Sequence, residues 1–194
     1  MPIAIEFLQA HPDIDIRIVQ ADRLVNLLED HVDLAVRIGE LPDSSLLATR
    51  VGSIRHVVCG SPAYFAQRGM PKSPGELGKH ECITFEGLMS PDAWTFGTGK
   101  STATAAVHSR LVVNTAEAAI DAAIAGVGIT RVLSYQIANA MRAGALAVAL
   151  RKFEPSPWPV SLVHSGARLL PLKLRAFLDF AAPRLRARLA ESAG

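Results

Sequence analysis

The chain has 194 residues, of which 49% are hydrophobic and 20% are charged, and its formal net charge is +2. This composition is typical of a folded globular protein and excludes a disordered one. The mild positive charge does not indicate a surface dedicated to nucleic acid, which normally carries a denser basic cluster.

The cysteines and the apolar runs indicate where the protein works. Cys59 and Cys82 each lie in an apolar, strand-like run. So sparse a pair is typical of buried thiols in a reducing compartment and not of a disulfide framework. No apolar run approaches the length of a membrane span, and the first ten residues lack the basic region of a signal peptide. We therefore expect a cytoplasmic protein that does not contact a membrane.

The first sixty residues alternate helical and extended patterns. Apolar residues at helical spacing predict helices at Pro2–Ala10 and around Leu24, Leu27 and Leu28. Alternating or β-branched apolar runs predict strands at Asp13–Val19, Val32–Ile38, Leu46–Val51 and Ile54–Cys59, with a loop at Pro42–Ser45. The order is therefore αβαβ, followed by two extended runs.

Helix-start signals come next in the chain. Ser61 before Pro62 predicts a capped helix that ends at Gly69. Ser73 and Glu76 have the spacing of a capping box and predict a short helical turn. Further strands are expected at Cys82–Phe85, Ala93–Phe96 and Thr104–His108.

Residues 110–130 predict a strand, a helix and a second strand. The β-branched run Leu111–Val113 precedes an alanine-rich helix over Ala116–Ala125. Asn114 and Thr115 are N-cap candidates, and Glu117 has the spacing to complete a capping box with Asn114. Gly126 should end this helix, and Gly128 permits a close approach of backbone before the strand that begins at Ile129.

In open α/β sheets, a helix start of this kind lies at the sheet edge where small ligands bind. Asn114 and Thr115 are thus candidate ligand contacts, although these residues alone favour a purely structural cap. The chain then predicts a helix over Ser134–Ala143, a strand over Leu146–Leu150, a proline-rich connector at 155–159, a strand over Val160–His164 and a helix from Pro171. Pro183 should kink or end that last helix, whose basic face we expect to be solvated.

Motifs for catalysis or cofactor binding are lacking. The six histidines never pair at metal-ligand spacing, so no metal site is predicted. The Gly126-x-Gly128 pattern lacks a third glycine and follows its helix, so no nucleotide cofactor is predicted. Neither Ser61 nor Cys59 lies in a nucleophile elbow, so we do not expect an enzyme.

Polar residues follow several predicted strands, namely Arg37, Glu86, Asn114 with Thr115, and Thr130. If these strands lie parallel in two facing sheets, the side chains converge on a cleft that could hold a carboxylate. An ordinary salt bridge explains Arg37 equally well, and simple core packing is the simpler explanation for Phe85, which precedes Glu86.

Five segments in order resemble the effector-binding domain of LysR-type transcriptional regulators: FLQAHPDIDI, VDLAVRIGELPDSSLLATRV, VVCGSPAYFAQRGMPKSPGELGKHECITF, LVVNTAEAAIDAAIAGVGI and SGARLLPLKLRAFLDF. The resemblance implies an α/β, periplasmic-binding-protein-like fold of type 2. Its two subdomains would comprise residues 1–60 with 162–194, and residues 61–161, with an effector in the cleft between them. The ligand contacts that it implies are Arg37, Ile38, Gly39, Phe85, Glu86, Asn114, Thr115, Gly128, Ile129 and Thr130.

The function implied by this resemblance is effector sensing by a regulatory domain that is not an enzyme. The effector would be a small anionic or aromatic molecule, no cofactor would be needed, and the chain would form a homodimer or a higher homo-oligomer. The family's winged helix-turn-helix and the first strand of its effector domain are expected to be missing here, so DNA would be bound only through residues outside this chain. The alternatives are a solute-binding receptor of the same fold, which a secretion signal would indicate, and a small hydrolase, which ester turnover would reveal.

Overall fold

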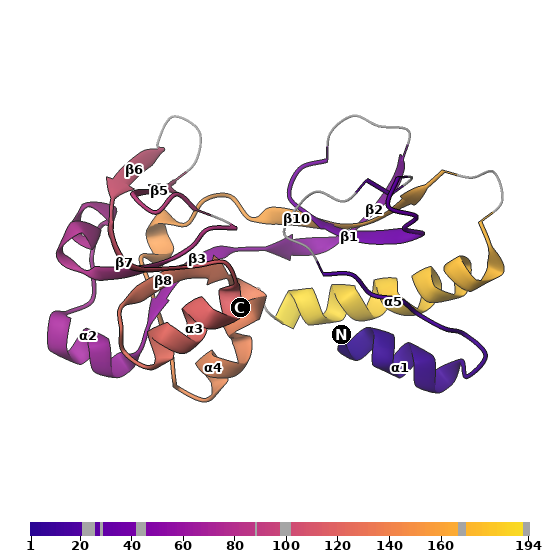
Figure 1. Ribbon diagram of the computed structural model, residues 1–194, viewed down its shortest axis with the longest axis horizontal. Helices are drawn as coiled ribbons and strands as arrows, with labels where there is room; N and C mark the ends of the chain where they lie inside the picture. The colour runs from indigo at the N-terminus through magenta and orange to yellow at the C-terminus, as the bar shows by residue number, and fades with distance from the viewer. Residues whose placement is uncertain are drawn as a thin grey trace. The chain divides into compact units, whose positions relative to one another are not determined.

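The structure is a computed structural model that describes residues 1–20, 26–27, 29–41, 46–87, 89–97, 102–166 and 170–191. The chain divides into two compact units (Figure 1). Unit 1 comprises Met1–Ile54 and Trp158–Gly194, and unit 2 comprises Arg55–Pro157. The sequence-based expectation put these boundaries at residues 60 and 161.

Unit 1 is built on a three-stranded antiparallel sheet with the order β1-β10-β2. The strands are β1 (Leu34–Ile38), β2 (Leu46–Ile54) and β10 (Trp158–Ser165). The central strand β10 supplies the most deeply buried residues of the sheet, and Leu162 is fully buried. All three strands were predicted from their apolar β-branched runs, and these predictions are confirmed.

Two helices complete unit 1: α1 (Pro2–Ala10) and α5 (Leu172–Glu191). They pack through an aromatic cluster around Phe7, which is fully buried. The ring of Phe7 meets those of Phe177 and Phe180 edge to face, with centroids 5.0 and 5.3 Å apart. Edge-to-face contact between buried rings stabilises the pair beyond the area that it buries.

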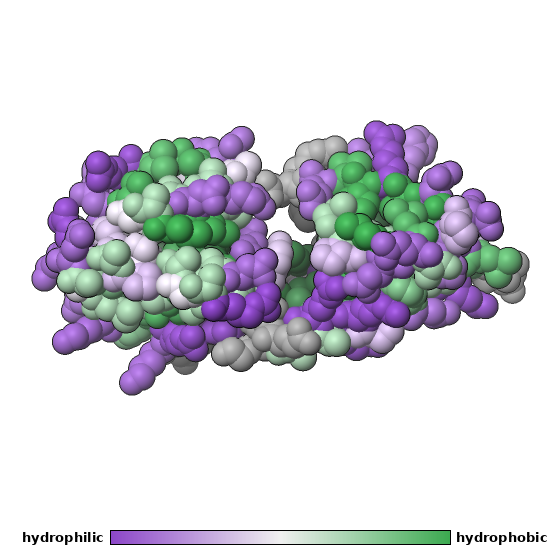
Figure 2. All heavy atoms as spheres, turned by 90° about the horizontal axis from the view of Figure 1, so that it is seen from below, coloured by the Kyte–Doolittle hydropathy of each residue, from purple (hydrophilic) through white to green (hydrophobic). Residues whose placement is uncertain are grey.

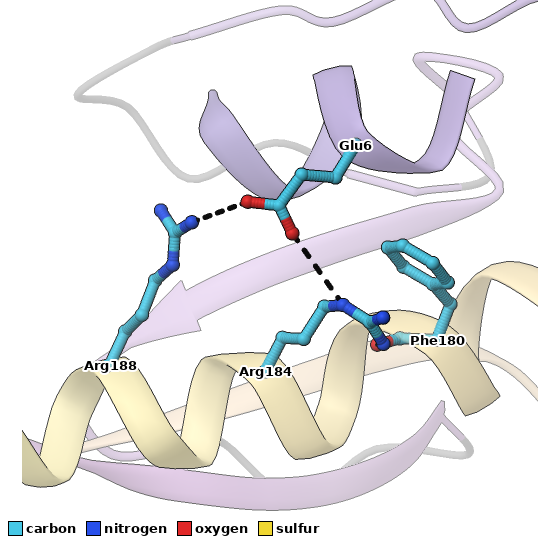
Figure 3. A network of polar contacts seen from close by, with 4 residues as sticks. All are labelled: Glu6, Phe180, Arg184 and Arg188. Carbon is cyan, nitrogen blue, oxygen red and sulfur yellow. Dashed lines mark hydrogen bonds and ion pairs between the residues drawn. The ribbon is translucent and has the colours of Figure 1, made fainter. Parts of the chain in front are cut away.

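A polar network runs beside this aromatic cluster (Figure 3). Glu6 of α1 forms ion pairs with Arg188 at 2.6 Å and with Arg184 at 3.5 Å, and the Arg184 guanidinium lies 3.5 Å from the Phe180 ring centroid. These charged side chains are each more than 40% exposed, so solvent screens their attraction. The contacts of the buried Phe7 ring therefore contribute more than the ion pairs to holding α1 on α5.

One expectation for unit 1 is wrong, and another is wrong in part, since Pro183 was expected to kink or end the last helix. Asp13–Val19 is not a strand. Alternating residues become a strand only when a neighbouring strand takes up the backbone hydrogen bonds, and neither edge strand of the sheet, β1 or β2, pairs with this segment. Pro183 does not end α5, which continues to Glu191; the proline lies on the exposed side of the helix, where solvent can hydrate a freed carbonyl.

Two further expectations fall on residues that the structure does not describe. The loop at Pro42–Ser45 lies outside the described residues, and so does most of the helix expected around Leu24 and Leu28.

Unit 2 contains a five-stranded sheet with the order β7-β4-β8-β3-β9. Its strands are β3 (His56–Gly60), β4 (Glu81–Phe85), β7 (His108–Val113), β8 (Ile129–Leu133) and β9 (Ala147–Ala149). Strand β4 runs parallel to both β7 and β8, whereas β3 is antiparallel to β8 and β9. The chain from β7 to β8 therefore crosses over β4, as a strand-helix-strand unit of a parallel sheet does.

Two apolar cores lie on opposite faces of this sheet, since successive side chains of a strand point to opposite sides. On one face, Ile83 and Phe85 pack against α3 (Ala116–Ile124) and against η3 (Ser134–Ile137), which α4 (Ala138–Arg142) follows. The other face packs against α2 (Pro62–Arg68), η1 (Pro74–Lys79) and the strand pair β5 (Ala93–Phe96) and β6 (Ala103–Ala106). Figure 1 shows α3 and the β5–β6 pair on opposite sides of the sheet. A short η4 (Arg151–Phe153) follows β9.

Local capping rules predicted one helix start of unit 2 and failed at another. The Ser61 side chain accepts a hydrogen bond from the Tyr64 N–H at 3.2 Å, and Gly69 ends α2, as predicted. The capping box at Ser73 is wrong, because η1 begins there without a side-chain cap. The Glu76 carboxylate instead accepts a hydrogen bond from the Lys72 N–H at 2.9 Å. Lys72 lies before the helix, so this bond does not cap it.

The surface carries some apolar residues on both units (Figure 2). In unit 1, Met1, Ile5 and Leu8 are exposed at helical spacing along α1, on the side away from the buried Phe7. Among the described residues, no helix is both long and apolar enough to cross a membrane.

Candidate functional site

The predicted site residues at the ends of β4 and β7 lie next to each other. Phe85 pairs with Val113, the last residue of β7, and the N–H of Glu86 donates to the Val113 carbonyl at 3.0 Å. The two strands are parallel, so Glu86 and Asn114 emerge at the same edge of the sheet. The structure therefore brings together two of the four polar segments that the sequence suggested.

The side chains at this edge divide into polar surface and buried support. Glu86, Asn114 and Thr115 are exposed, whereas Phe85 is only 4% exposed and belongs to the core beneath α3. Gly87 passes over the Phe85 ring so closely that a Cβ there would lie 2.8 Å from a ring carbon. Phe85 thus packs in the core, which the sequence analysis gave as the simpler explanation for this residue.

The start of α3 supplies electrostatic attraction for an anion at the same edge. Thr115 is the N-cap residue, and its hydroxyl oxygen accepts a hydrogen bond from the Ala118 N–H at 3.2 Å. The capping box expected between Asn114 and Glu117 is wrong, because the N-cap residue is Thr115, one position later. The nine-residue helix directs the positive end of its dipole toward the edge that carries Asn114.

This cap assignment makes a direct prediction. Thr115→Ala should lower the free energy of unfolding by about 1 kcal/mol, because one N–H of the first helical turn loses its acceptor. Asn114→Ala should change it by less than about 0.5 kcal/mol, because Asn114 precedes the cap. Urea unfolding of the two variants measures both effects, and a larger loss for Asn114→Ala would contradict the assignment.

Gly128, Ile129 and Thr130 lie away from this edge. Ile129 pairs with Cys82 and Thr130 with Ile83, near the beginning of β4, so these residues start β8 and do not end it. The Thr130 hydroxyl is fully buried and donates to the Ile83 carbonyl at 2.9 Å. The expectation that Thr130 ends a strand beside Asn114 is therefore wrong. A ligand role for these three residues stays a prediction.

Arg37, Ile38 and Gly39 belong to unit 1, where they end strand β1. Arg37 is half-buried and pairs across the sheet with Ser161. Gly39 has a φ of 106°, which favours glycine, and its N–H donates to the Pro159 carbonyl at 2.9 Å. This turn fixes where β1 ends and places Arg37 one residue before that end.

A buried polar cluster in unit 2 was missed at the sequence level. Arg131 of β8 is only 8% exposed; its guanidinium donates to the Thr95 carbonyl at 2.6 Å and lies 5.2 Å from the Phe96 ring centroid. Burial lowers the Arg131 pKa to about 10. Burial, together with the Arg131 charge, lowers the pKa of His56 to about 4. The signal in the sequence was a charged residue inside the apolar run ITRVL.

The low His56 pKa predicts loss of stability in acid. An unfolded His56 takes up a proton near pH 6.5, whereas the folded one does so only near pH 4. Neutral His56 therefore makes its full contribution to the free energy of unfolding above about pH 6.5. This contribution is lost as the pH falls to about 4, and the total loss is about 3 kcal/mol.

The measurement is the free energy of unfolding of the unmodified protein and of His56→Gln between pH 7.5 and 4. The difference between the two should shrink as the pH falls across this range. Parallel curves would contradict the lowered pKa.

The two thiols are sealed inside unit 2. Cys59 and Cys82 are fully buried, and burial raises each pKa to about 12, with the nearby Glu81 charge adding to the effect on Cys82. Reactive cysteines need a low pKa and access, and these have neither. Among the described residues, no three His, Cys, Asp or Glu side chains are grouped so that they could hold a metal ion.

Comparison with known proteins decides the family. A family profile described as LysR substrate binding domain matches residues 1–186. The chain belongs to the LysR substrate-binding-domain family. The resemblance carried by the sequence segments is therefore confirmed, and the chain is an effector-binding domain of the LysR type.

The relatives of this LysR domain are transcriptional regulators. The chain is 30% identical over 184 residues to the uncharacterized HTH-type transcriptional regulator YhjC of Escherichia coli (strain K12), a match covering 94% of this chain and 62% of that protein. The chain thus spans less than two thirds of the relative's length.

Solved structures confirm the α/β, periplasmic-binding-protein-like fold. The regulatory domain of CrgA, a LysR-type transcriptional regulator from Neisseria meningitidis, is 29% identical with a TM-score of 0.81, covering 95% of this chain and 90% of that one. The regulatory domain of AphB in Vibrio vulnificus is 26% identical with a TM-score of 0.79. The match covers 94% of this chain and 90% of that one.

Proposed function

We propose that this LysR domain senses a small organic effector, anionic or aromatic, on behalf of a DNA-binding transcriptional regulator. The observation that carries the proposal is the family match over residues 1–186. Nothing in the proposed role requires bond making or breaking, so the domain acts as a sensor without a catalytic step. Ligand binding would shift the population of its conformations, and DNA contacts would come from residues outside this chain.

The exposed edge of unit 2 is the part of the effector site that we propose in most detail. Glu86, Asn114 and Thr115 surround the N-terminal end of α3, where a carboxylate is favoured by the helix dipole and by free N–H groups. The Glu86 carboxylate nearby favours a ligand that also carries a hydrogen-bond donor. We therefore expect the effector class to be small hydroxylated or amino-substituted carboxylates, aromatic ones included.

The remaining predicted contacts lie outside the exposed edge of unit 2, and each group has a different place in the proposal. Arg37, Ile38 and Gly39 would serve as unit 1 contacts, for which the planar guanidinium of Arg37 suits a carboxylate. Phe85 would support the edge from below and would not contact the ligand. Gly128, Ile129 and Thr130 have the least support, because they lie at the opposite end of β8 from this edge.

The proposed assembly is a cytoplasmic homodimer or higher homo-oligomer. It is supported by the exposed apolar row Met1, Ile5 and Leu8 on α1, which water solvates unfavourably. Light scattering of the purified chain should give twice the monomer mass or more, and Ile5→Asp should lower that mass. A monomer at every concentration tested would contradict the assembly.

The experiment for the function is a thermal-shift screen of small carboxylates and aromatic compounds. A ligand present at 100 times its dissociation constant should raise the free energy of unfolding by about 2.7 kcal/mol. Asn114→Ala should reduce the shift for the active compound while leaving the melting temperature of the ligand-free protein unchanged, since Asn114 does not cap α3.

The matched control is Gly75→Ala, at a position with no atom within 4 Å of an added Cβ, and it should respond to the ligand like the unmodified protein. Absence of any saturable shift across the panel would overturn the proposal. An unchanged shift in Asn114→Ala would remove the unit 2 edge from the site but leave effector sensing standing.

A further inference from the structure

We infer that unit 2 contains a second binding site, built on Arg131 and Trp94, that holds a small monovalent anion such as a halide or nitrate. This site lies under the β5–β6 pair on one face of the sheet, whereas the proposed effector contacts lie at the sheet edge. It does not depend on the proposed function, since its two donors, Arg131 and Trp94, are not among the predicted effector contacts.

The first observation is a buried positive charge with no negative partner among the described residues. Arg131 is 8% exposed, and among the described residues its guanidinium donates only to the Thr95 carbonyl, with the Phe96 ring beside it. The ion pairs found in the described part of the chain involve other arginines. A buried charge is strongly destabilising unless it is paired, so a bound anion beside this guanidinium would stabilise the folded protein.

The second observation is a buried donor on the same face of the sheet. Trp94 is 1% exposed, and its indole Nε1 has no acceptor. Trp94 and Phe96 project from the same face of β5, two residues apart, and the Phe96 ring lies against the Arg131 guanidinium. Buried N–H groups are nearly always paired in folded proteins. One anion accepting from the guanidinium and from the indole would satisfy both donors.

The surroundings select the charge and size of the anion. Most neighbours on this face are apolar or aromatic, including Phe96, Ile129 and Leu150, and His56 lies there as well. An anion must lose most of its water there, which is far more costly for a doubly charged ion than for a singly charged one. Bromide and nitrate are weakly hydrated, so they should bind more tightly than fluoride.

His56 adds to the local positive potential when it is protonated. His56 lies on β3, the strand beside β8, and pairs with Leu133. Its pKa is lowered to about 4 partly by the Arg131 charge. A bound anion would offset that repulsion. We therefore expect anion binding to raise the pKa of His56 toward its ordinary value.

The test is thermal unfolding of the whole chain with sodium bromide or nitrate replacing sodium fluoride at constant ionic strength. The melting temperature should rise and saturate with bromide or nitrate concentration, as one-site binding to the folded state requires. Arg131→Met should abolish the saturable rise. Trp94→Phe keeps the ring but removes the N–H, and it should weaken the anion affinity about tenfold, the worth of one hydrogen bond to a charged group.

The matched control is Arg142→Met, which removes an exposed positive charge from the same unit and should keep the full response. The width of the chloride NMR line gives an independent measurement that needs no unfolding. The protein should broaden this line, and added bromide should reverse the broadening by competing for the site. If Arg131→Met does not fold, Trp94→Phe carries the test. A response that is linear in anion concentration, or equal in Trp94→Phe and the unmodified protein, would overturn the inference.

Discussion

Gly128→Ala should lower the free energy of unfolding by about 3 kcal/mol or more. A Cβ at Gly128 would overlap the carbonyl oxygen of Glu81 and would lie 2.9 Å from its carbonyl carbon. Both atoms are backbone of the adjacent strand β4, so no side chain can turn aside. Relief requires β4 and β8 to separate at the point where their parallel pairing begins.

The matched control for this prediction is again Gly75→Ala. A Cβ there meets no atom within 4 Å, and its φ is not in the left-handed region, so the change should stay within about 0.5 kcal/mol. Urea unfolding of both variants, with the midpoint and the slope fitted separately, measures the difference. Equal midpoints for the two variants would show that β4 and β8 do not approach as closely as described.

Phe7→Ala should lower the free energy of unfolding by about 3 to 5 kcal/mol, because it removes a fully buried aromatic side chain and leaves a cavity. It also removes both edge-to-face contacts, with Phe177 at 5.0 Å and with Phe180 at 5.3 Å. These rings hold α1 on α5, so the loss should be greatest in the first ten residues and in the middle of α5.

The neighbouring Leu8 is a control on the same helix. It is 37% exposed, so Leu8→Ala should cost less than about 1 kcal/mol. Hydrogen exchange should show faster exchange in α1 and α5 for Phe7→Ala, with unit 2 unchanged. Similar losses for the two variants would mean that helix propensity, and not the aromatic contact, keeps α1 in place.

The sequence by itself determined the elements whose cause is local. The helix Pro2–Ala10 follows from apolar spacing, α2 follows from Ser61 before Pro62, and α3 ends before Gly126 because that residue has a φ of 79°. These features depend on residues within one helical turn of each other. For the same reason, the family segments could be recognised from the sequence, and the profile match confirms them.

Only the tertiary structure decided which of these elements meet. The alternating run Asp13–Val19 is not a strand, because strand formation needs a partner for its backbone. Thr130 looked like the end of a strand, but the parallel register with Ile83 places it near the beginning. The apolar run around Arg131 was a signal in the sequence, but it did not indicate that the β5–β6 pair would cover this residue.

The candidate site shows the same division. Polar residues after apolar runs predicted Glu86, Asn114 and Thr115, and parallel pairing of β4 and β7 brings the segments that carry them to one edge. Which strands pair, and in which register, depends on contacts between residues far apart in the chain, such as Cys82 with Ile129. Patterns along the chain specify each element, whereas the edge at which a side chain emerges is set by hydrogen bonds to a distant strand.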